Sequence, residues 1–303
     1  MVGNTPIGWG KTDDATSIAA IHKSLDRGVN FFDTADFYGL GHSEELLGQE
    51  LGNNPAVIIA TKVGHRNIDG AIQFDYTKEY ILRACDLSLQ RLKRDTIDYY
   101  QLHTARLHHF EKECCVEAMQ LLQEQGKIRY WGLSLNTFYP EPEAGLMMQN
   151  NWGDGFQLVF NIINQRALSL LEVAKENNYG VIARMPLQFG LLTGKFTADT
   201  NFTSDDHRSF RFNPSILKNA LIALEQLVWP MCEKYSINKT SLALSYKLSY
   251  DAVHTVIPGI RTPQQAVDNT SSLIQLDTED RDLIEQAFIT HFAAVVDEME
   301  KQG

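Results

Sequence analysis

Four side chains whose types suit proton transfer occur in the first third of the sequence, three of them directly after short apolar segments. Asp33 and Tyr38 lie in the segment FFDTADFYG. Lys62 ends the segment IIATK, and His103 ends DYYQLH. A carboxylate, a phenol, an amine and an imidazole can hold and move protons, whereas a nearby ammonium group disfavours a bound cation. The set therefore predicts acid–base chemistry rather than a metal site, although each residue taken alone also fits an ordinary place such as a helix cap or a loop.

The elements that would position these side chains are predicted by short apolar runs that alternate with longer segments whose apolar residues recur at helical spacing. This alternation is typical of a parallel sheet whose strands are joined by helices. In a barrel of this kind the carboxyl ends of the strands meet at one face, so Asp33, Lys62 and His103 are expected to lie together. The predicted strands are 29–32, 57–60, 97–102, 130–133, 156–160, 181–185 and 253–257.

Seven strands, each followed by a helix, fit a (β/α) barrel that lacks one strand, and an open doubly wound sheet is the alternative. Helices are predicted over 80–92, 115–125 and 168–177, and a further amphipathic helix over the last 25 residues. The stretch 191–214 has no clear periodicity, and its length is more typical of a functional loop than of a linker. Because strands and helices resume after it, we expect residues 1–303 to form a single domain.

The charge balance argues against a broad interface for nucleic acid or membrane. Lys and Arg total 27 against 38 Asp and Glu, for a net charge of −11 at pH 7. A surface of that sign repels phosphate backbones and anionic lipids. No apolar run approaches the roughly 20 residues that a membrane-spanning helix needs, and the segment MVGNTPIGWG lacks the features of a signal peptide. We therefore expect a cytoplasmic protein with free thiols at its four cysteines and with neither nucleic acid nor a membrane as its partner.

The motifs FFDTADFYG, IIATK and DYYQLH, taken together and in this order, resemble those of the aldo-keto reductases. The resemblance continues through GKIR and GLS, then PL and GLLTGK, and ends in IPGIR, so that it covers nearly the whole chain. Members of that family are (β/α)8 TIM barrels that use NAD(P)H. The resemblance therefore implies an α/β barrel of this type and an NADP-dependent oxidoreductase that interconverts carbonyl groups and alcohols.

The same resemblance assigns a role to each of the four residues. Tyr38 would be the general acid that protonates a carbonyl oxygen while hydride arrives from the nicotinamide. An unperturbed tyrosine has a pKa of about 10, so a neighbouring cation is needed to favour its phenolate near neutral pH, and Lys62 would supply it. Asp33 would keep Lys62 charged and oriented through an ion pair. His103 would polarise the substrate carbonyl by hydrogen bonding, and Phe37 would line the substrate pocket.

For the nicotinamide, the resemblance points to Ser134 and Gln157 as hydrogen-bonding partners of the carboxamide. Many family members have Asn directly after this serine, whereas here Leu135 follows and Asn136 comes one residue later. Which of Leu135 and Asn136 holds that place is left open by the sequence. Arg184 occupies the position of an aromatic ring beneath the nicotinamide, and a planar guanidinium can also stack on a flat ring.

The remaining contacts of the cofactor are expected in the second half of the chain. Small residues permit close approach of the backbone to a pyrophosphate, and Lys195 would add positive charge there. Arg261 matches the position that faces the adenosine 2′-phosphate, which favours NADPH over NADH because a guanidinium gains more from a phosphate than from a hydroxyl. The full set expected for the pyrophosphate and the adenosine is Pro186, Leu187, Gly190, Lys195, Gly259, Arg261, Gln265 and Asn269.

The sequence departs from the family pattern before Asp13. Family members usually begin with a short hairpin and a first barrel strand, and here Met1 falls about where that strand should end. A truncated chain, replacement of the strand by another segment or subunit, and a barrel that tolerates the gap are the alternatives. The gap also leaves open an NADPH-binding regulatory subunit or an inactive relative and, with less support, a different barrel enzyme such as an isomerase of phosphorylated sugars.

The substrate is not predicted beyond its class. Aldehydes, ketones and open-chain sugars all fit the resemblance, because the loops contain both aromatic residues and polar ones such as His65, Arg66 and His207. The acidic composition argues mildly against strongly anionic substrates, unless the pocket overrides it.

Overall fold

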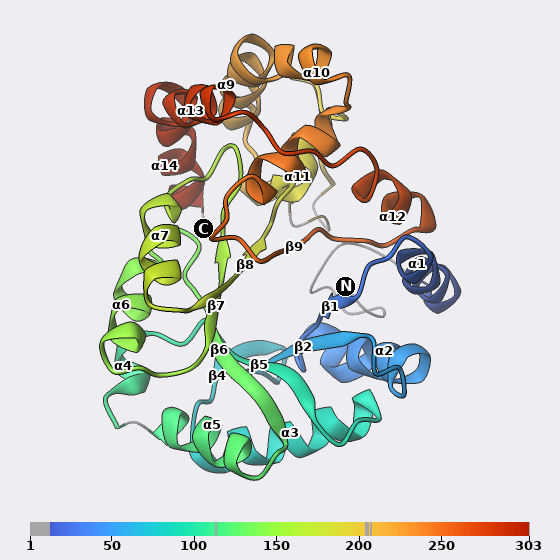
Figure 1. Ribbon diagram of the computed structural model, residues 1–303, viewed down its shortest axis with the longest axis vertical. Helices are drawn as coiled ribbons and strands as arrows, with labels where there is room; N and C mark the ends of the chain where they lie inside the picture. Colours follow the sequence, from blue (N-terminus) through green and yellow to red (C-terminus); the bar gives the residue numbers. More distant parts are fainter. Residues whose placement is uncertain (1–12, 113, 204–205, 207, 303) are drawn as a thin grey trace.

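Seven parallel strands form the sheet that positions the site in the computed structural model, which describes residues 13–112, 114–203, 206 and 208–302. The order along the sheet is β1-β2-β5-β6-β7-β8-β9. The sheet curls into a nearly closed barrel with helices on its outside (Figure 1). The strands are β1 (Phe31–Asp33), β2 (Ile58–Val63), β5 (Ile97–His103), β6 (Ile128–Ser134), β7 (Gly155–Val159), β8 (Gly180–Arg184) and β9 (Thr255–Ile257).

The predicted strands and the barrel architecture are confirmed. Each strand of the sheet overlaps a predicted one, and the bounds differ by at most three residues. The alternative of an open doubly wound sheet is wrong, because the strands follow one another around the sheet in chain order, whereas a doubly wound sheet reverses its order at a switch point.

Side-chain caps and prolines set the starts of several helices. The Asp13 carboxylate accepts a hydrogen bond from the Thr16 amide at 2.8 Å, and the Asn213 side chain accepts one from the Ile216 amide at 2.8 Å. Pro214 then occupies the first turn of its helix, where its missing N–H costs nothing. The helices are α1 (Asp14–Asp26), α2 (His42–Leu51), α3 (Lys78–Leu92), α4 (Leu107–Phe110), α5 (Cys114–Glu124), α6 (Glu141–Gln149), α7 (Leu168–Glu176), α8 (Arg208–Arg211), α9 (Pro214–Ala223), α10 (Pro230–Tyr235), α11 (Lys239–Leu248), α12 (Pro263–Asn269), α13 (Thr278–Ala287) and α14 (Ala293–Gln302).

Shorter helical segments complete the chain: the 3₁₀ segments η1 (Tyr38–Gly41) and η2 (Gln188–Thr193), and the π turns η3 (Leu224–Val228) and η4 (Phe288–Phe292). The helices predicted over 80–92, 115–125 and 168–177 are confirmed as α3, α5 and α7, and the predicted terminal helix is α13, η4 and α14 in series. The stretch 191–214, predicted to be irregular, holds the end of η2 and the single turn α8, with the remaining described residues before α9 in turns and irregular structure.

The barrel interior is closed by side chains below the strand ends that carry the polar residues. Ala60, Tyr99 and Ile182 form a small buried cluster there. Glycine is required at position 132, because a Cβ atom at that position would lie 2.0 Å from the Tyr99 hydroxyl and 2.1 Å from the carbonyl oxygen of Gly155. This tight packing leaves the carboxyl ends of the strands as the face on which chemistry can occur.

A two-stranded hairpin that was not predicted stands beside this face. It consists of β3 (His65–Ile68) and β4 (Ala71–Phe74), which pair in antiparallel fashion. Asp69 and Gly70 connect the strands with φ of 53° and 84°. An Asp-Gly pair with two positive φ values is the preferred two-residue hairpin connection. The hairpin brings His65 from the end of β2 toward the site.

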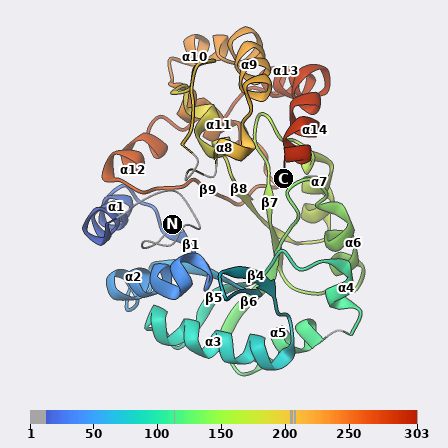
Figure 2. The ribbon, with the colours of Figure 1, turned by 180° about the vertical axis from the view of Figure 1, so that it is seen from behind.

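The two edges of the sheet, β1 and β9, lie next to α1 and α12. These two helices run side by side in both views (Figures 1 and 2), and the Arg27 guanidinium of the first donates to the Thr270 hydroxyl of the second at 2.9 Å. Between β1 and β9 no strand occurs in the described part of the chain. The hairpin and first strand that the sequence is predicted to lack would precede α1, so this prediction falls on residues 1–12, which lie outside the described residues. None of the helices described is long and apolar enough to cross a membrane.

Candidate active site

The four residues predicted to move protons lie together at the carboxyl ends of β1, β2 and β5. Asp33 ends β1, Lys62 is the fifth residue of β2, and His103 ends β5. Tyr38 begins η1, the turn that follows β1. Three successive neighbours in the sheet thus supply the acid, the amine and the imidazole, as the strand pattern predicts.

A short ion pair joins Lys62 to Asp33 in the interior. The Lys62 side chain is 1% exposed, and its Nζ lies 2.5 Å from Asp33 Oδ2 and 2.7 Å from the carbonyl oxygen of Thr34. The other carboxylate oxygen of Asp33 accepts from Gln157 Nε2 at 2.6 Å and from Gln101 Nε2 at 3.3 Å. Because both oxygens are engaged, the carboxylate is fixed in orientation and so is the ammonium group that it holds.

The charge of Lys62 survives its burial. Burial by itself lowers the pKa of a lysine, but the adjacent Asp33 carboxylate and the Tyr38 phenol outweigh it and hold the Lys62 pKa above its usual value. The ammonium group lies 5.1 Å from the centre of the Tyr38 ring. This places a fixed positive charge next to the ring whose hydroxyl faces the cavity.

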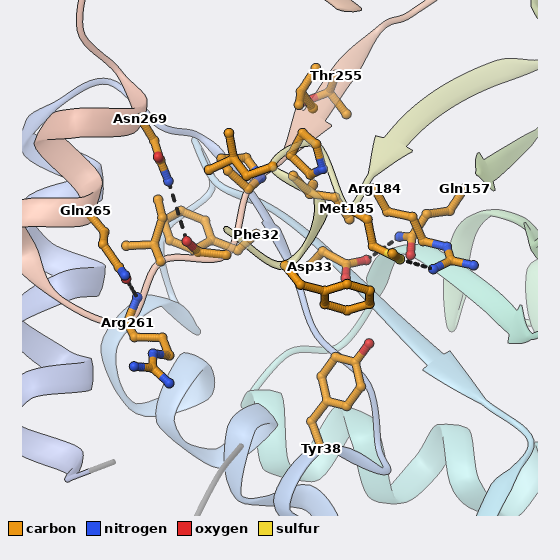
Figure 3. Close-up of a pocket in the computed structure, with 18 of the residues that line it drawn as sticks. Phe32, Asp33, Tyr38, Gln157, Arg184, Met185, Thr255, Arg261, Gln265 and Asn269 are labelled. Atoms are coloured by element: carbon orange, nitrogen blue, oxygen red, sulfur yellow. Dashed lines mark hydrogen bonds between the residues drawn. The ribbon is translucent and has the colours of Figure 1, made fainter. Parts of the chain in front are cut away.

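Tyr38 reaches the open side of the site. Its side chain is 38% exposed, and Figure 3 shows its hydroxyl directed into the cavity on the side of Asp33. The ring meets the His103 ring edge to face, with centroids 5.9 Å apart. Tyr38 begins η1, and the two residues after it form a left-handed turn, since Gly39 and Leu40 have φ of 61° and 57°. Tyr38 is therefore accessible to a small molecule and to solvent protons.

His103 is stacked against a second imidazole from the hairpin. The rings of His103 and His65 lie 3.9 Å apart with an interplanar angle of 10°. The Thr104 hydroxyl donates to the His103 carbonyl at 2.7 Å and lies 3.0 Å from His65 Nε2. Together, the stack and this hydrogen bond fix both rings.

Both imidazoles are neutral near pH 7. Burial, followed by electrostatic interactions with His65 and Lys62, holds the pKa of His103 well below its usual value. Burial likewise lowers the pKa of His65 to about 4. A neutral His103 can donate its ring N–H to a carbonyl oxygen without adding charge beside Lys62. His65 was noted in the sequence only among variable loop residues; the Asp-Gly pair that follows it was the signal for the hairpin that positions it.

One cavity of about 1260 Å³ connects this reacting end to the region between β9 and α12. In Figure 3, Tyr38, Gln157 and Arg184 lie on one side of it and Arg261, Gln265 and Asn269 on the other. Most of the predicted site residues line it. They are Asp33, Phe37, Tyr38, His103, Asn136, Gln157, Arg184, Pro186, Leu187, Gly190, Gly259, Arg261, Gln265 and Asn269.

Three predicted site residues do not line the cavity. Lys62 lies just beneath it, in contact with Asp33 and Tyr38. Ser134 is 2% exposed at the end of β6 and is set behind the cavity surface. Lys195 is exposed, but it lies outside the cavity lining.

Leu135 and Asn136, the two candidates for the second contact with the carboxamide, lie in different surroundings. Leu135 is fully buried in the core, whereas Asn136 lines the cavity. The Asn136 side-chain oxygen accepts from the amides of Phe138 and Tyr139 at 2.9 and 3.4 Å, which fixes the turn after β6. Of the two residues, Asn136 is thus the one that can reach a bound ligand.

Arg184 ends β8 with its guanidinium held against the turn after β6. It donates to the Leu135 carbonyl and to the Thr137 hydroxyl, both at 3.1 Å. Burial lowers its pKa to about 10, which still leaves it charged at neutral pH. This fixed, flat cation therefore forms part of the cavity wall close to Tyr38.

At the other end, hydrogen bonds shape the loop between β9 and α12. Gln265 accepts from the Arg261 amide at 2.7 Å, and Asn269 donates to the Gly259 carbonyl at 3.4 Å (Figure 3). The Arg261 side chain is exposed beside this loop. On the facing side, Gly190 has a φ of 98° within η2, a backbone shape that favours glycine and leaves no side chain in the way.

The residues present fit a nicotinamide dinucleotide. Such a cofactor needs polar groups beside the reacting atoms, room for the backbone to approach a pyrophosphate, and a cation at the adenosine end. The cavity offers Asn136 and Gln157 at the first place, Gly190 at the second and Arg261 at the third. His103 Nδ1 and Arg184 Nε are also buried without a hydrogen-bond partner, as groups awaiting a ligand would be.

Comparison with known proteins gives a consistent result. The model of the family described as "Aldo/keto reductase family" matches residues 2–289. The chain is 32% identical to "Aldo-keto reductase YhdN" of Bacillus subtilis over 85% of this chain and 78% of that protein. It is 31% identical to "Uncharacterized oxidoreductase YqkF" of the same organism, over 85% and 82%. Among solved structures, the glycerol dehydrogenase AKR11B4 from Gluconobacter oxydans superposes with a TM-score of 0.81 at 28% identity, covering 93% of this chain and 88% of that one.

Proposed function

The chain belongs to the aldo/keto reductase family, and from that premise we propose that it is an NADPH-dependent reductase of aldehyde and ketone carbonyls. Several of its relatives are named as oxidoreductases or reductases, and its neighbours in structure are barrels of the same family. The observation that carries the proposal is the buried pair of Lys62 and Asp33 beneath Tyr38, with His103 beside it. We further propose that the chain acts as one barrel domain on a small-molecule substrate.

The proposed reaction adds a hydride to the carbonyl carbon and a proton to its oxygen. When bound, the nicotinamide supplies the hydride. Tyr38 donates its hydroxyl proton to the oxygen as the carbon–oxygen double bond becomes single. The Lys62 ammonium stabilises the phenolate that remains, and Asp33 holds that ammonium in place. Because Tyr38 is partly exposed, solvent can return the proton after the alcohol leaves.

His103 and Phe37 would orient the substrate. A neutral His103 donates its N–H to the carbonyl oxygen, which draws electron density toward that atom as negative charge develops on it. Phe37 is buried at the cavity wall and meets the His65 ring edge to face at 5.7 Å, so it offers a flat apolar surface to the carbon skeleton. Gln157 would bind the carboxamide of the cofactor while holding Asp33. In this proposal Asn136 takes the second carboxamide contact, and Ser134 supports the turn behind it.

The direct test is the initial rate of NADPH oxidation with a reactive aromatic aldehyde. We expect turnover in the wild-type chain and a loss of about 10²-fold or more in Tyr38→Phe, because no other group at that position can donate the proton. Tyr130→Phe is the matched control, since Tyr130 is exposed on β6 away from the cavity. Near-native turnover in Tyr38→Phe would remove Tyr38 from its role. Binding of NADPH with no turnover in the wild type would instead support a regulatory, cofactor-binding function.

Cofactor preference follows from Arg261. Removing its guanidinium in Arg261→Ala is expected to raise the KM for NADPH about tenfold and to leave the KM for NADH within a factor of two, because a 2′-hydroxyl gains little from a guanidinium. Steady-state rates with each cofactor at one fixed aldehyde concentration measure both constants. Equal KM values for NADPH and NADH in the wild-type chain would contradict this role.

A further inference from the structure

The cavity is strongly cationic in a chain that is acidic overall. Among the described residues that line it, Asp33 is the single carboxylate, and the charge of Asp33 is balanced by Lys62. The chain as a whole carries −11. Arginines gathered in one cavity of an acidic chain favour a ligand of negative charge there. The guanidinium groups that line the cavity are those of Arg106, Arg184, Arg208, Arg211 and Arg261.

These arginines divide between the two ends of the cavity. Arg261 lies at the adenosine end with Gln265 and Asn269 (Figure 3). Arg106 comes three residues after His103, in the loop that follows β5, and so lies at the reacting end. Arg184 also belongs to that end, where its charge interacts with those of Tyr38 and Asp33. A phosphate at the adenosine end therefore accounts for Arg261 but not for the two cations near Tyr38.

Arg106 and Arg184 have no carboxylate partner in the described part of the chain. In contrast, Arg208 forms an ion pair with Asp206 at 2.5 Å. Arg106 Nη1 and Arg184 Nε are both buried and without a hydrogen-bond acceptor. Burial lowers the pKa of Arg184; the charges of Tyr38 and Asp33 act to raise it, and those of Arg211 and Arg106 act to lower it. Unpaired buried cations are costly, so their presence together points to an anion that completes the site.

We infer that the substrate of the proposed reduction carries an anionic group, a carboxylate or a phosphate, which Arg106 and Arg184 bind while the carbonyl meets Tyr38 and His103. The inference rests on the proposed function and deepens it. The planar guanidinium group of Arg106 matches the oxygens of either anion, and the Nε–H of Arg184, which has no acceptor, can donate beside it. The neutral rings of His65 and His103 leave the arginines as the charged groups that select at this end. The local charge of the pocket thus overrides the acidic composition, which by itself argues against such substrates.

The experiment compares para-formylbenzoate with its methyl ester, two aromatic aldehydes that differ in one negative charge. The kcat/KM of each is measured with saturating NADPH in the wild-type chain, in Arg106→Gln and in Arg106→Lys. Comparing the anion-to-ester ratio between proteins cancels the intrinsic difference in reactivity of the two aldehydes. We expect the ratio to fall about tenfold in Arg106→Gln, through KM rather than kcat, and to recover partly in Arg106→Lys.

Two controls separate charge at this place from other effects. Arg83→Gln removes one positive charge from an exposed residue of α3 outside the cavity lining, and the ratio should stay at the wild-type value. The Kd for NADPH, measured by its fluorescence, should be the same in Arg106→Gln as in the wild type. A weakened Kd would show that Arg106 serves the cofactor pyrophosphate, which would overturn the inference.

Failure of this inference and failure of the proposed function give different results. Tyr38-dependent reduction of both aldehydes with a ratio that Arg106→Gln leaves unchanged would overturn the anionic substrate and keep the carbonyl reductase. Absence of NADPH oxidation with either aldehyde, in a folded wild-type chain, would overturn the reductase itself and the inference with it. A ratio that falls in Arg106→Gln and is partly restored by lysine supports both.

Discussion

Two lysines, Lys62 on β2 and Lys247 on α11, are buried to nearly the same extent, at 1% and 0% exposure, but they differ in what surrounds them. Lys62 faces the Asp33 carboxylate, and its pKa is held above the usual value despite the opposing effect of burial. Lys247 donates to the carbonyl oxygen of Ala243, and among the described residues no carboxylate lies within ion-pair distance of it. Burial, with nothing to oppose it, holds the pKa of Lys247 well below the usual value.

The difference shows what makes a buried amine useful for chemistry. An acidic partner keeps Lys62 charged beside Tyr38, where a positive charge can stabilise a phenolate. Without such a partner, Lys247 resides in the core at a cost, as a group that prefers to lose its proton. Burial of Lys62 at the end of β2 therefore costs stability but provides a fixed charge for the site. Burial of Lys247 on α11 also costs stability and provides no charge that the fold uses.

Removing the charged member of this comparison should have the largest effect. In Lys62→Met we expect turnover to fall about 10³-fold, because Tyr38 loses the cation that favours its phenolate. The free energy of unfolding should also fall by about 3 kcal/mol, since Asp33 is left in the interior without its partner. Aldehyde-dependent NADPH oxidation and urea denaturation measure the two effects.

A double variant separates the two roles of Lys62. Adding Asp33→Asn to Lys62→Met removes the unpaired charge, so it should restore most of the stability and none of the activity. Wild-type stability and turnover in Lys62→Met alone would show that the Lys62–Asp33 ion pair contributes to neither.

The uncharged member of the comparison should respond in the opposite direction. Replacing the unpaired amine in Lys247→Met is expected to raise the free energy of unfolding by about 1 to 2 kcal/mol near neutral pH, because a hydrophobic side chain fills the site without the cost of desolvation. Activity should stay at the wild-type level. Lys218→Met, at an exposed position on α9, is the matched control and should leave stability nearly unchanged.

The pH dependence of this gain has a definite sign. The folded chain disfavours the proton on Lys247, whereas the unfolded chain binds it up to the ordinary lysine value of 10.5. The wild-type chain therefore takes up a proton on unfolding, and its stability from this group rises with pH until that value is reached. The advantage of Lys247→Met should accordingly shrink as pH rises from about 8 toward 10. A gain that is constant over this range would show that Lys247 is charged in the folded state.

Much of the fold could be predicted because a (β/α) barrel produces two patterns in its sequence: short apolar runs at the strands and helical periodicity between them. Buried parallel strands appear as short apolar runs such as 97–102, and their spacing by helical segments fixes chain order around the barrel. Asp33, Lys62 and His103 could be placed near one another for the same reason, since polar residues at strand ends gather on one face. Tyr38 does not end a strand, and its position depends on the left-handed turn at Gly39 and Leu40.

Other parts depend on geometry that the sequence does not express. His65 enters the site through a hairpin whose local sequence signal is limited to the Asp-Gly pair at its turn, because its two four-residue strands are too short to give a clear alternation. Ser134 and Asn136 are two positions apart in the sequence. Asn136 lines the cavity and Ser134 does not, and the turn after β6 sets this difference. Lys195 lies outside the cavity lining and directly follows Gly194, where the chain turns with a φ of 75°. Lys247 looks like a surface residue of an amphipathic helix, and only the packing of α11 buries it.

The central claim is that Tyr38, poised by the paired Lys62, gives the proton in carbonyl reduction. The most direct test measures NADPH binding and single-turnover oxidation side by side in the wild-type chain and in Tyr38→Phe, with one reactive aromatic aldehyde. The account predicts equal NADPH affinity in the two proteins and a loss of single-turnover rate of about 10²-fold or more in the variant. Equal rates in the two proteins would contradict it.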